Sequence, residues 1–445
     1  MDDLLLKPDK SKNYRGFEKI NGLNFAKTNV KDRKYDYLLS LMGIKKAETT
    51  FENGILYLSI GNGNPPKTDC KEHETVIEIG NGGITVSGRT SDEISNGVKM
   101  LIDMYASRGK TGYFPIGEFR YVPKIKLRAV HMCLFDPDDG TQKEDTNISS
   151  VRRRIETAAL SGYNSLILEF WGMFPYEKRE YAHWRNCHSR ESVEKLISFI
   201  IDDLHMTAIP CQNLTSHAGW SRITSRRHVV LDQCPDLSDM YIPGGWCFAT
   251  TREDTKAFLR DIMDDLVKTF RNPPLFHCSC DKCFGFGSSE EERVLPADDL
   301  FVNHLKFLRD ELEKRGARMA MWADMLYSSI DVKYWKCSEG TADRLPKDIL
   351  MNIWTHNDIG NGEWKDITYF EDKGFETAYS PWINKDGAKN MVEQCLKHNS
   401  LGIIQTTWHK PETALPTVVY TGGYMWSAKE PSAETVKSHV RWKNV

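Results

Sequence analysis

The feature that most constrains the fold is an apolar segment followed by an amphipathic one, a pair that recurs eight times after residue 126. The eight apolar segments, which we expect to be strands, are 128–134, 163–170, 207–213, 274–279, 317–323, 349–355, 376–382 and 401–408. Helical spacing of apolar residues lies between several of them, as in 189–204, 252–270, 298–315 and 386–399. Nearly continuous apolar strands favour parallel pairing with helices over the outer face. Eight such units predict a (β/α)8 barrel, the TIM barrel.

The first 125 residues follow another pattern, which is typical of a small α/β unit. Alternating segments predict strands at 54–60, 75–79 and 83–87, and a Gly-rich turn joins the last two. Ser91 then begins an amphipathic helix. A chain of 445 residues is long enough for both parts. We therefore expect an accessory α/β domain at 1–125 and a catalytic-type barrel at 126–445.

Charge and cysteine content narrow the class of protein. The net charge is −3 and the Lys and Arg residues are scattered, which argues against a nucleic-acid partner. No apolar run is long enough for a membrane helix, and the first residues lack the charge and apolar run of a signal peptide. The 11 cysteines, an odd number at uneven spacing, do not form a typical disulfide framework. We expect a cytoplasmic protein with reduced thiols and no membrane partner, and the sequence does not indicate its oligomeric state.

Candidate site residues follow from the fold, because the active site of such a barrel lies at the carboxyl ends of its strands. The sequence places Glu169, His217, His277, Asp281, Trp322, Asp324, Trp354, Trp382 and Trp408 at or just beyond these ends, with Arg128 near the start of the first strand. We expect these side chains to line one cavity. The connection 214–250 is unusually long, and we expect it to cover the same end of the barrel.

Each of the last four predicted strands has Trp as its last or next-to-last residue. Core layers of these barrels favour branched aliphatic residues, so four Trp residues at equivalent ends are hard to explain by core packing alone. Because an indole ring offers a large apolar face, it stacks well on the apolar face of a sugar ring. The pattern favours a carbohydrate pocket over the alternative, in which the four rings only pack the core and rim.

The segment Leu275–Cys283, LFHCSCDKC, resembles the strand-end motif H-x-G-x-D-E of the family 20 glycoside hydrolases, the β-N-acetylhexosaminidases. Several other segments are similar to this family, and most of them to its hexosaminidase D branch: 123–130, 164–170 with 173–177, 209–212 with 216–217, and 322–326. The N-terminal unit also resembles the small domain that precedes family 20 barrels. The resemblance therefore extends over most of the chain.

The resemblance implies a substrate class and a set of roles. In the family, the Asp orients the acetamido group of a terminal N-acetylhexosamine, whose oxygen attacks the anomeric carbon, and the Glu protonates the leaving oxygen. The Asp corresponds to Asp281, and an Arg that binds a pair of sugar hydroxyls corresponds to Arg128. Glu169, at the end of the second strand, is a further candidate catalytic carboxylate. No cofactor is expected.

The chain departs from the family at two positions where the family has Glu. Lys282 occupies the position of the Glu, and an ammonium group is a poor acid at pH 7, since its ordinary pKa is about 10.4. The last strand ends in Trp408-His409-Lys410, where the family has Trp-Gly-Glu. The leading hypothesis is a glycoside hydrolase with an altered acid. The alternative is a carbohydrate-binding pseudoenzyme that kept the pocket and lost catalysis.

Three cysteines suggest a third alternative. Cys278 follows His277 directly, and Cys280 and Cys283 come a few residues later. Because thiolates bind zinc tightly, this cluster would supply metal ligands. A zinc-bound thiolate would then serve a zinc-dependent glycosidase as its nucleophile. Strand alternation argues partly against the cluster, because Cys278 and Cys280 share one side and His277 points to the other. The competing interpretation is that the cysteines are small core residues.

Overall fold

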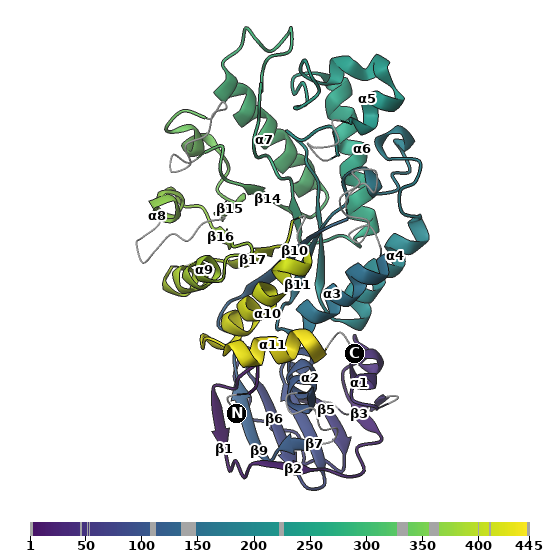
Figure 1. Ribbon diagram of the computed structural model, residues 1–445, viewed down its shortest axis with the longest axis vertical. Coiled ribbons are helices and arrows are strands. Elements are labelled where there is room, and N and C mark those ends of the chain that lie inside the picture. The colour runs from purple at the N-terminus through teal and green to yellow at the C-terminus, as the bar shows by residue number, and fades with distance from the viewer. Residues whose placement is uncertain are drawn as a thin grey trace.

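The computed structural model has two parts, an N-terminal domain and a barrel, which lie one above the other in Figure 1. It describes residues 3–44, 47–50, 52, 54–106, 113–134, 148–221, 227–326, 337–355, 365–398, 400–408 and 411–442. His409 and Lys410, which stand where the family has Gly-Glu, lie outside the described residues.

The N-terminal domain is a twisted sheet covered by a helix. Seven strands in the order β1-β9-β6-β7-β5-β3-β4 form the main sheet, and β2 pairs with β8. The bounds are β1 Lys10–Lys12, β2 Phe17–Lys19, β3 Ala26–Thr28, β4 Ala47–Thr49, β5 Leu56–Gly61, β6 Thr75–Gly80, β7 Gly83–Gly88, β8 Tyr113–Pro115 and β9 Gly117–Tyr121, with helices α1 Asp36–Ser40 and α2 Ser91–Ala106. The predicted strands of this domain are therefore present as β5, β6 and β7.

The second part is a closed barrel of eight parallel strands, which confirms the predicted fold class. The strands are β10 Leu127–Cys133, β11 Ser165–Glu169, β12 Thr207–Cys211, β13 Leu275–His277, β14 Arg318–Trp322, β15 Leu350–Trp354, β16 Thr377–Ser380 and β17 Gly402–Thr406. The helices are α3 Ile148–Leu160, α4 Arg190–Ser198, α5 Val229–Gln233, α6 Glu253–Thr269, α7 Ala297–Lys314, α8 Lys365–Asp372, α9 Lys385–Lys397, α10 Pro411–Ser427 and α11 Ala433–Trp442. All eight predicted barrel strands coincide with these elements.

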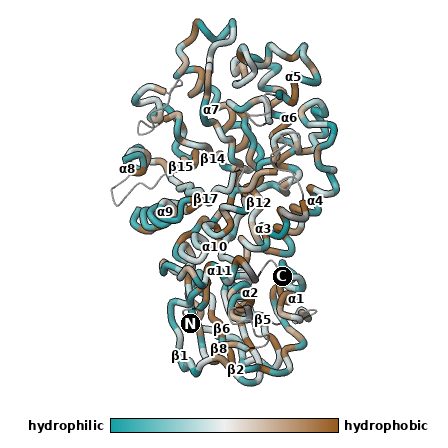
Figure 2. The backbone as a smooth tube through the Cα atoms, in the orientation of Figure 1, coloured by the Kyte–Doolittle hydropathy of each residue, from teal (hydrophilic) through white to brown (hydrophobic). Residues whose placement is uncertain are grey.

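Apolar side chains fill the barrel interior, and polar side chains lie nearer to the carboxyl ends of the strands. A separate buried cluster contains Ala129, Ile167, Ile209, Cys211, Leu275, Ala320, Leu350, Ala378 and Ile404, with members from all eight strands. Hydrophilic residues line the outer helices, as the teal colour of α9 shows in Figure 2. The barrel is therefore a packed core with a polar upper layer at the carboxyl ends of its strands.

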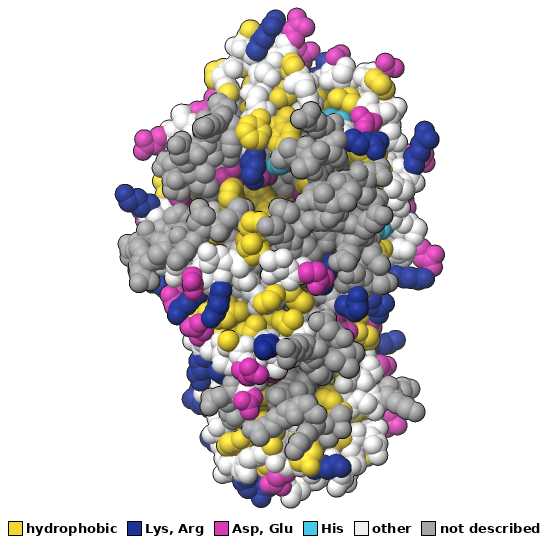
Figure 3. Space-filling model, viewed as in Figure 1, with side chains coloured by type: hydrophobic (Ala, Val, Ile, Leu, Met, Phe, Trp, Pro, Cys, Tyr) yellow, Lys and Arg dark blue, Asp and Glu magenta, His cyan; other side chains and the backbone are white. Residues whose placement is uncertain are grey.

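The C-terminal helix α11 lies between the two domains (Figure 1). His439 on α11 pairs with the buried Asp103 on α2, and the same carboxylate accepts a hydrogen bond from the backbone of Leu6 at 2.8 Å. Hydrophobic side chains gather where α10 and α11 meet (Figure 3), and there they line a groove of about 380 Å³. Among the described residues, no helix has the length and apolar character required to cross a membrane.

Two buried cations face each other at the domain junction. Arg128 donates from Nε to Gly162 O and from Nη1 to Ile125 O, both at 2.7 Å. Lys99 on α2 is 2% exposed, and within the described part of the chain no carboxylate lies at ion-pair distance from either side chain. Burial, aided by the charge of Arg128, lowers the pKa of Lys99 to about 7. Arg128 also lines a cavity of about 1080 Å³ between the domains.

Candidate active site at the carboxyl ends of the strands

Backbone conformation marks the carboxyl ends of the strands as unusual. Bulky residues take left-handed backbone angles there, with φ of 47° at His217, 47° at Lys282 and 43° at Trp408. Ser279 and Cys280, just after β13, do the same at 60° and 69°. Such angles are costly for side chains other than Gly, and they concentrate at functional sites, where they direct side chains to particular positions. After β13 they bring Asp281 and Lys282 over the end of the barrel.

Asp281 and Lys282 form an ion pair that further groups hold in place. Lys282 Nζ lies 2.6 Å from Asp281 Oδ2, and His217 Nε2 lies 3.6 Å from the same oxygen. Trp246 donates from Nε1 to the carbonyl of Lys282 at 2.7 Å, and Ser216 donates to the carbonyl of Asp281. His217, Ser216 and Trp246 all belong to the segment 214–250, so the segment covers this end of the barrel as predicted.

The ion pair sets the charge of both groups. Burial alone would raise the pKa of Asp281, but Lys282 and His217 outweigh it and hold the pKa well below its usual range. Burial would lower the pKa of Lys282, but 32% of the side chain is exposed, and the nearby carboxylates of Asp281, Asp324 and Glu169 raise its pKa above the ordinary value. Asp281 is therefore an anion and Lys282 a cation at neutral pH. A cation with a raised pKa is unsuited to donate a proton.

One tryptophan contacts this pair, and three others lie at the same end of the barrel. Lys282 Nζ lies 4.8 Å from the ring centre of Trp354, whose Nε1 donates to the buried Asp324 at 3.2 Å. Trp382 donates to the carbonyl of Thr407 at 3.3 Å. Trp354, Trp382 and Trp408 are partly exposed, so they offer ring faces to a ligand. Trp322 is buried and packs against Trp408, with ring centres 5.5 Å apart. It therefore forms part of the floor of the site.

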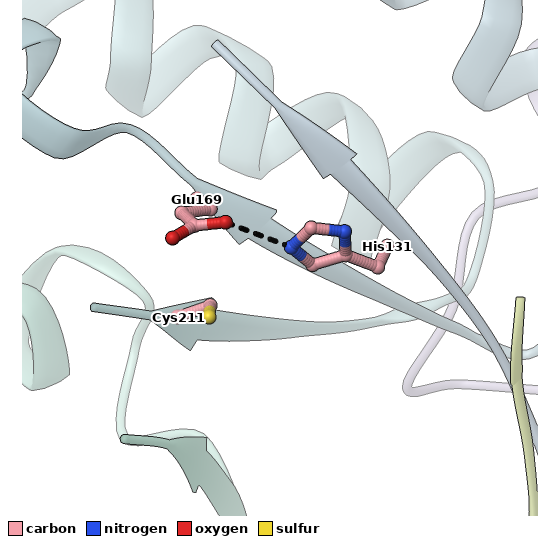
Figure 4. Close-up of side chains that lie close together, drawn as sticks. All are labelled: His131, Glu169 and Cys211. Atoms are coloured by element: carbon pink, nitrogen blue, oxygen red, sulfur yellow. Dashed lines mark hydrogen bonds and ion pairs between the residues drawn. The ribbon is translucent and has the colours of Figure 1, made fainter. Parts of the chain in front are cut away.

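Glu169 lies buried in a second polar group, shown in Figure 4 with two of its neighbours. One oxygen, Oε1, accepts hydrogen bonds from Asn213 Nδ2 at 2.6 Å and from Trp171 Nε1. The other, Oε2, lies 3.0 Å from His131 Nε2 and 3.6 Å from Cys133 Sγ. The carboxylate is therefore held on both oxygens.

His277 belongs to the floor of the site. Its Nδ1 accepts from the backbone of Ser279 at 3.1 Å, and its ring lies 4.4 Å from that of Trp322. Burial and the neighbouring His131 lower the pKa of His277 to about 3, so it is a neutral imidazole. The side chain has no exposed surface. It therefore supports the residues above it.

Two sequence-based expectations about this site are wrong. Arg128 is the second residue of β10 and precedes Ala129, which pairs with the first residue of β11, whereas Glu169 ends β11. Arg128 thus lies at the opposite end of the barrel, against Trp426 at 5.1 Å. The strand continues for five further residues beyond Arg128 before it reaches the site.

The cysteine cluster also fails to converge. Thr215 donates to Cys280 Sγ at 3.2 Å, and Cys283 Sγ points to backbone carbonyls of Cys280 and Asp281. Burial raises the pKa of the Cys278 thiol well above its usual value and that of Cys280 to about 12. Within the described chain, the three sulfur atoms form no group of metal-ligand geometry, and the cysteines are buried core residues.

Sequence reasoning missed the polar residues inside the first strands. His131 and Cys133 alternate with apolar residues along β10, and Asn213 follows β12. The available signal was the period of two, since Ala129, His131 and Cys133 share one side of the strand. Trp246 was missed because nothing in the long connection distinguished it from a packing residue.

Comparison with known proteins identifies the fold of the chain but no sequence family. No protein-family model and no curated protein sequence matches the chain. Similar solved structures include a GH20 exo-β-N-acetylglucosaminidase from Vibrio harveyi in complex with N-acetylglucosamine (12% identity, TM-score 0.71, covering 100% of this chain and 77% of that one). Others are a β-N-acetylhexosaminidase from Bacteroides fragilis (13%, 0.69, 97% and 92%) and a Streptomyces plicatus N-acetyl-β-hexosaminidase in complex with Thio-NAglucal (12%, 0.66, 96% and 90%).

These similarities show that the chain has a GH20-like fold, a (β/α)8 barrel preceded by an N-terminal domain. Similarity at this level of identity establishes the fold, and the acidic, Trp-rich strand ends lie at the end of the barrel where the active sites of such folds are found.

Proposed function

We propose that the protein is a glycoside hydrolase that acts on terminal N-acetylhexosamine or a related amino sugar. The observation that carries the proposal is the buried Asp281 anion just after the fourth barrel strand, at the end of the barrel that also carries the partly exposed rings of Trp354, Trp382 and Trp408. The fold is that of enzymes solved with N-acetylglucosamine, which supports the choice of sugar.

Asp281 has a free acceptor for the substrate. Lys282 and His217 both contact Oδ2, and Oδ1 has no partner among the described residues. An acetamido N–H would donate to Oδ1, and this contact turns the acetamido oxygen towards the anomeric carbon. The oxygen then attacks that carbon as the glycosidic bond breaks, which is substrate-assisted catalysis.

Leaving-group protonation is the weak step. Lys282 stays a cation, and the carboxylate of Glu169 is engaged on both oxygens. The enzyme would therefore cleave activated aryl glycosides, which need little protonation, much faster than unactivated ones. The ion pair also supports a second candidate function, a carbohydrate-binding protein without catalysis, because it occupies the position from which an acid would act.

An activity and binding screen tests the proposal. Purified protein is incubated with activated aryl glycosides of N-acetylglucosamine, N-acetylgalactosamine and glucose, and the binding of the free sugars is measured by calorimetry. Turnover of the N-acetylated aryl glycosides alone supports the hydrolase. Binding without turnover favours the second candidate, and neither binding nor turnover rejects both.

The compartment is part of the proposal as well. All 11 cysteines are free thiols in the structure, which supports a reducing environment such as the cytoplasm. The expected partner is a carbohydrate, and the near-neutral charge again supports no nucleic-acid partner.

A further inference from the structure

We propose that His131, Glu169 and Cys211 bind a zinc ion inside the barrel, below the sugar site. One ligand atom of each residue, His131 Nε2, a carboxylate oxygen of Glu169 and Cys211 Sγ, lies within 4.8 Å of the other two. The three side chains come from the neighbouring strands β10, β11 and β12 and point towards one another in Figure 4. All three are buried, at 0%, 2% and 1% exposed.

The strand register explains the convergence. Glu169 pairs with Cys211 on β12 and with Cys133 on β10, and His131 precedes Cys133 by two residues, on the same side of its strand. The arrangement therefore rests on the barrel backbone, so the three ligand atoms are held by rigid strands. It is also the one such group found in the described part of the chain.

The mixture of ligand atoms points to zinc. Imidazole nitrogen, carboxylate oxygen and thiolate sulfur together suit this borderline-soft cation, which is commonly tetrahedral. Bonds of about 2.0 to 2.3 Å in a tetrahedron separate ligand atoms by about 3.3 to 3.8 Å. His131 Nε2 and Glu169 Oε2 are already 3.0 Å apart, so small side-chain shifts complete the site.

Neighbouring groups orient the ligand set. Asn213 and Trp171 hold Oε1 of Glu169, which directs Oε2 towards His131. Such an outer hydrogen bond to a ligating carboxylate is typical of protein metal sites. Cys133 Sγ lies 3.6 Å from Oε2 and 3.9 Å from His131 Nε2, so a second thiol lies beside the ligand set.

Metal analysis tests the assignment without reference to hydrolysis, so it stands or falls apart from the proposed function. The full-length protein is stripped with a chelator, reloaded with zinc and freed of excess metal, and its zinc content is measured. We expect about one zinc per chain, with loss of most of it in Cys211→Ala. Cys278→Ala is the matched control, because it removes an equally buried thiol outside the proposed site and should retain the metal.

Two further measurements keep the test decisive if a variant folds poorly. Cobalt loading of the unmodified protein should give thiolate-to-metal absorption in the near ultraviolet, and zinc should raise its Tm in a concentration-dependent way. Asn213→Ala should weaken metal affinity by roughly 10- to 100-fold, because it frees the carboxylate ligand. A protein that takes up no zinc, or one that loses it in Cys278→Ala and keeps it in Cys211→Ala, would overturn the assignment.

Discussion

Lys282 Nζ lies 2.6 Å from Asp281 Oδ2, so the residue that we expected at the position of the family's acid forms an ion pair with the carboxylate that orients the substrate in the proposed function. The pair neutralises a charge that is otherwise buried, which explains how Asp281 stays ionised there. The raised pKa of Lys282 in this pair also makes it unsuited to protonate a leaving oxygen. The contact therefore keeps Asp281 ionised for its proposed role and leaves the site without a proton donor at position 282.

Asp281→Asn should abolish both sugar binding and hydrolysis. The amide replaces the anionic acceptor and leaves the Lys282 cation without its partner, which is costly in a site this buried. Calorimetry with N-acetylglucosamine and the aryl-glycoside assay measure the two effects. Asp310→Asn, on the exposed surface of α7, is the control and should change neither.

Sugar binding should not depend on the titration of Asp281 near neutral pH. Its folded-state pKa is lowered, so the stability that it contributes is complete above the ordinary carboxyl pKa of about 3.9 and declines as the pH falls below that value. We therefore expect no loss of affinity from this group between about pH 8 and pH 5. A drop in affinity at about pH 6 that Asp281→Asn removes would show that the carboxyl pKa is raised instead.

Trp354→Ala should weaken sugar binding by about 5-fold, since one stacked aromatic face is worth roughly 1 kcal/mol. The ring also contacts Lys282 and Asp324, so its removal loosens the ion pair. Trp354→Phe retains a ring face and should keep most of the affinity. Equal affinities for the unmodified protein and Trp354→Ala, measured by calorimetry, would exclude this ring from the sugar site.

Lys99→Met should stabilise the protein at pH 7 by up to about 5 kcal/mol, because each unit of lowered pKa is worth about 1.4 kcal/mol. The folded-state pKa of about 7 lies below the ordinary value, so the cost of the buried cation is complete below about pH 7 and disappears as the pH rises past about 10.4. Urea unfolding should show the gain at pH 7 and little of it at about pH 10. Lys306→Met, exposed on α7, is the control.

The barrel could be predicted because its strands are buried on both faces and therefore read as apolar runs, as 163–170 and 401–408 do. The position of Asp281 also followed from the strand that precedes it. Distances across the barrel could not be predicted, since they depend on register and strand length. Arg128 shows this, because its strand places it at the far end from Glu169.

The cysteines also show that contacts across the barrel could not be predicted from the sequence. Cys278, Cys280 and Cys283 are close in sequence, but the left-handed backbone at Ser279 and Cys280 turns them in different directions. Cys211 meets His131 and Glu169 from two other strands, a contact that sequence spacing does not express. Proximity in sequence predicted the wrong cluster, and barrel register produced a different one.

The most direct test of the proposed hydrolase compares Lys282→Glu with the unmodified protein on two N-acetylglucosaminides, one with an activated aryl and one with an alkyl leaving group. We predict that the unmodified protein cleaves mainly the aryl glycoside. Lys282→Glu should raise kcat/KM for the alkyl glycoside by about 10²- to 10⁴-fold, the usual contribution of a general acid, and should affect the aryl glycoside far less. Rapid cleavage of the alkyl glycoside by the unmodified protein, abolished in Lys282→Glu, would contradict the account.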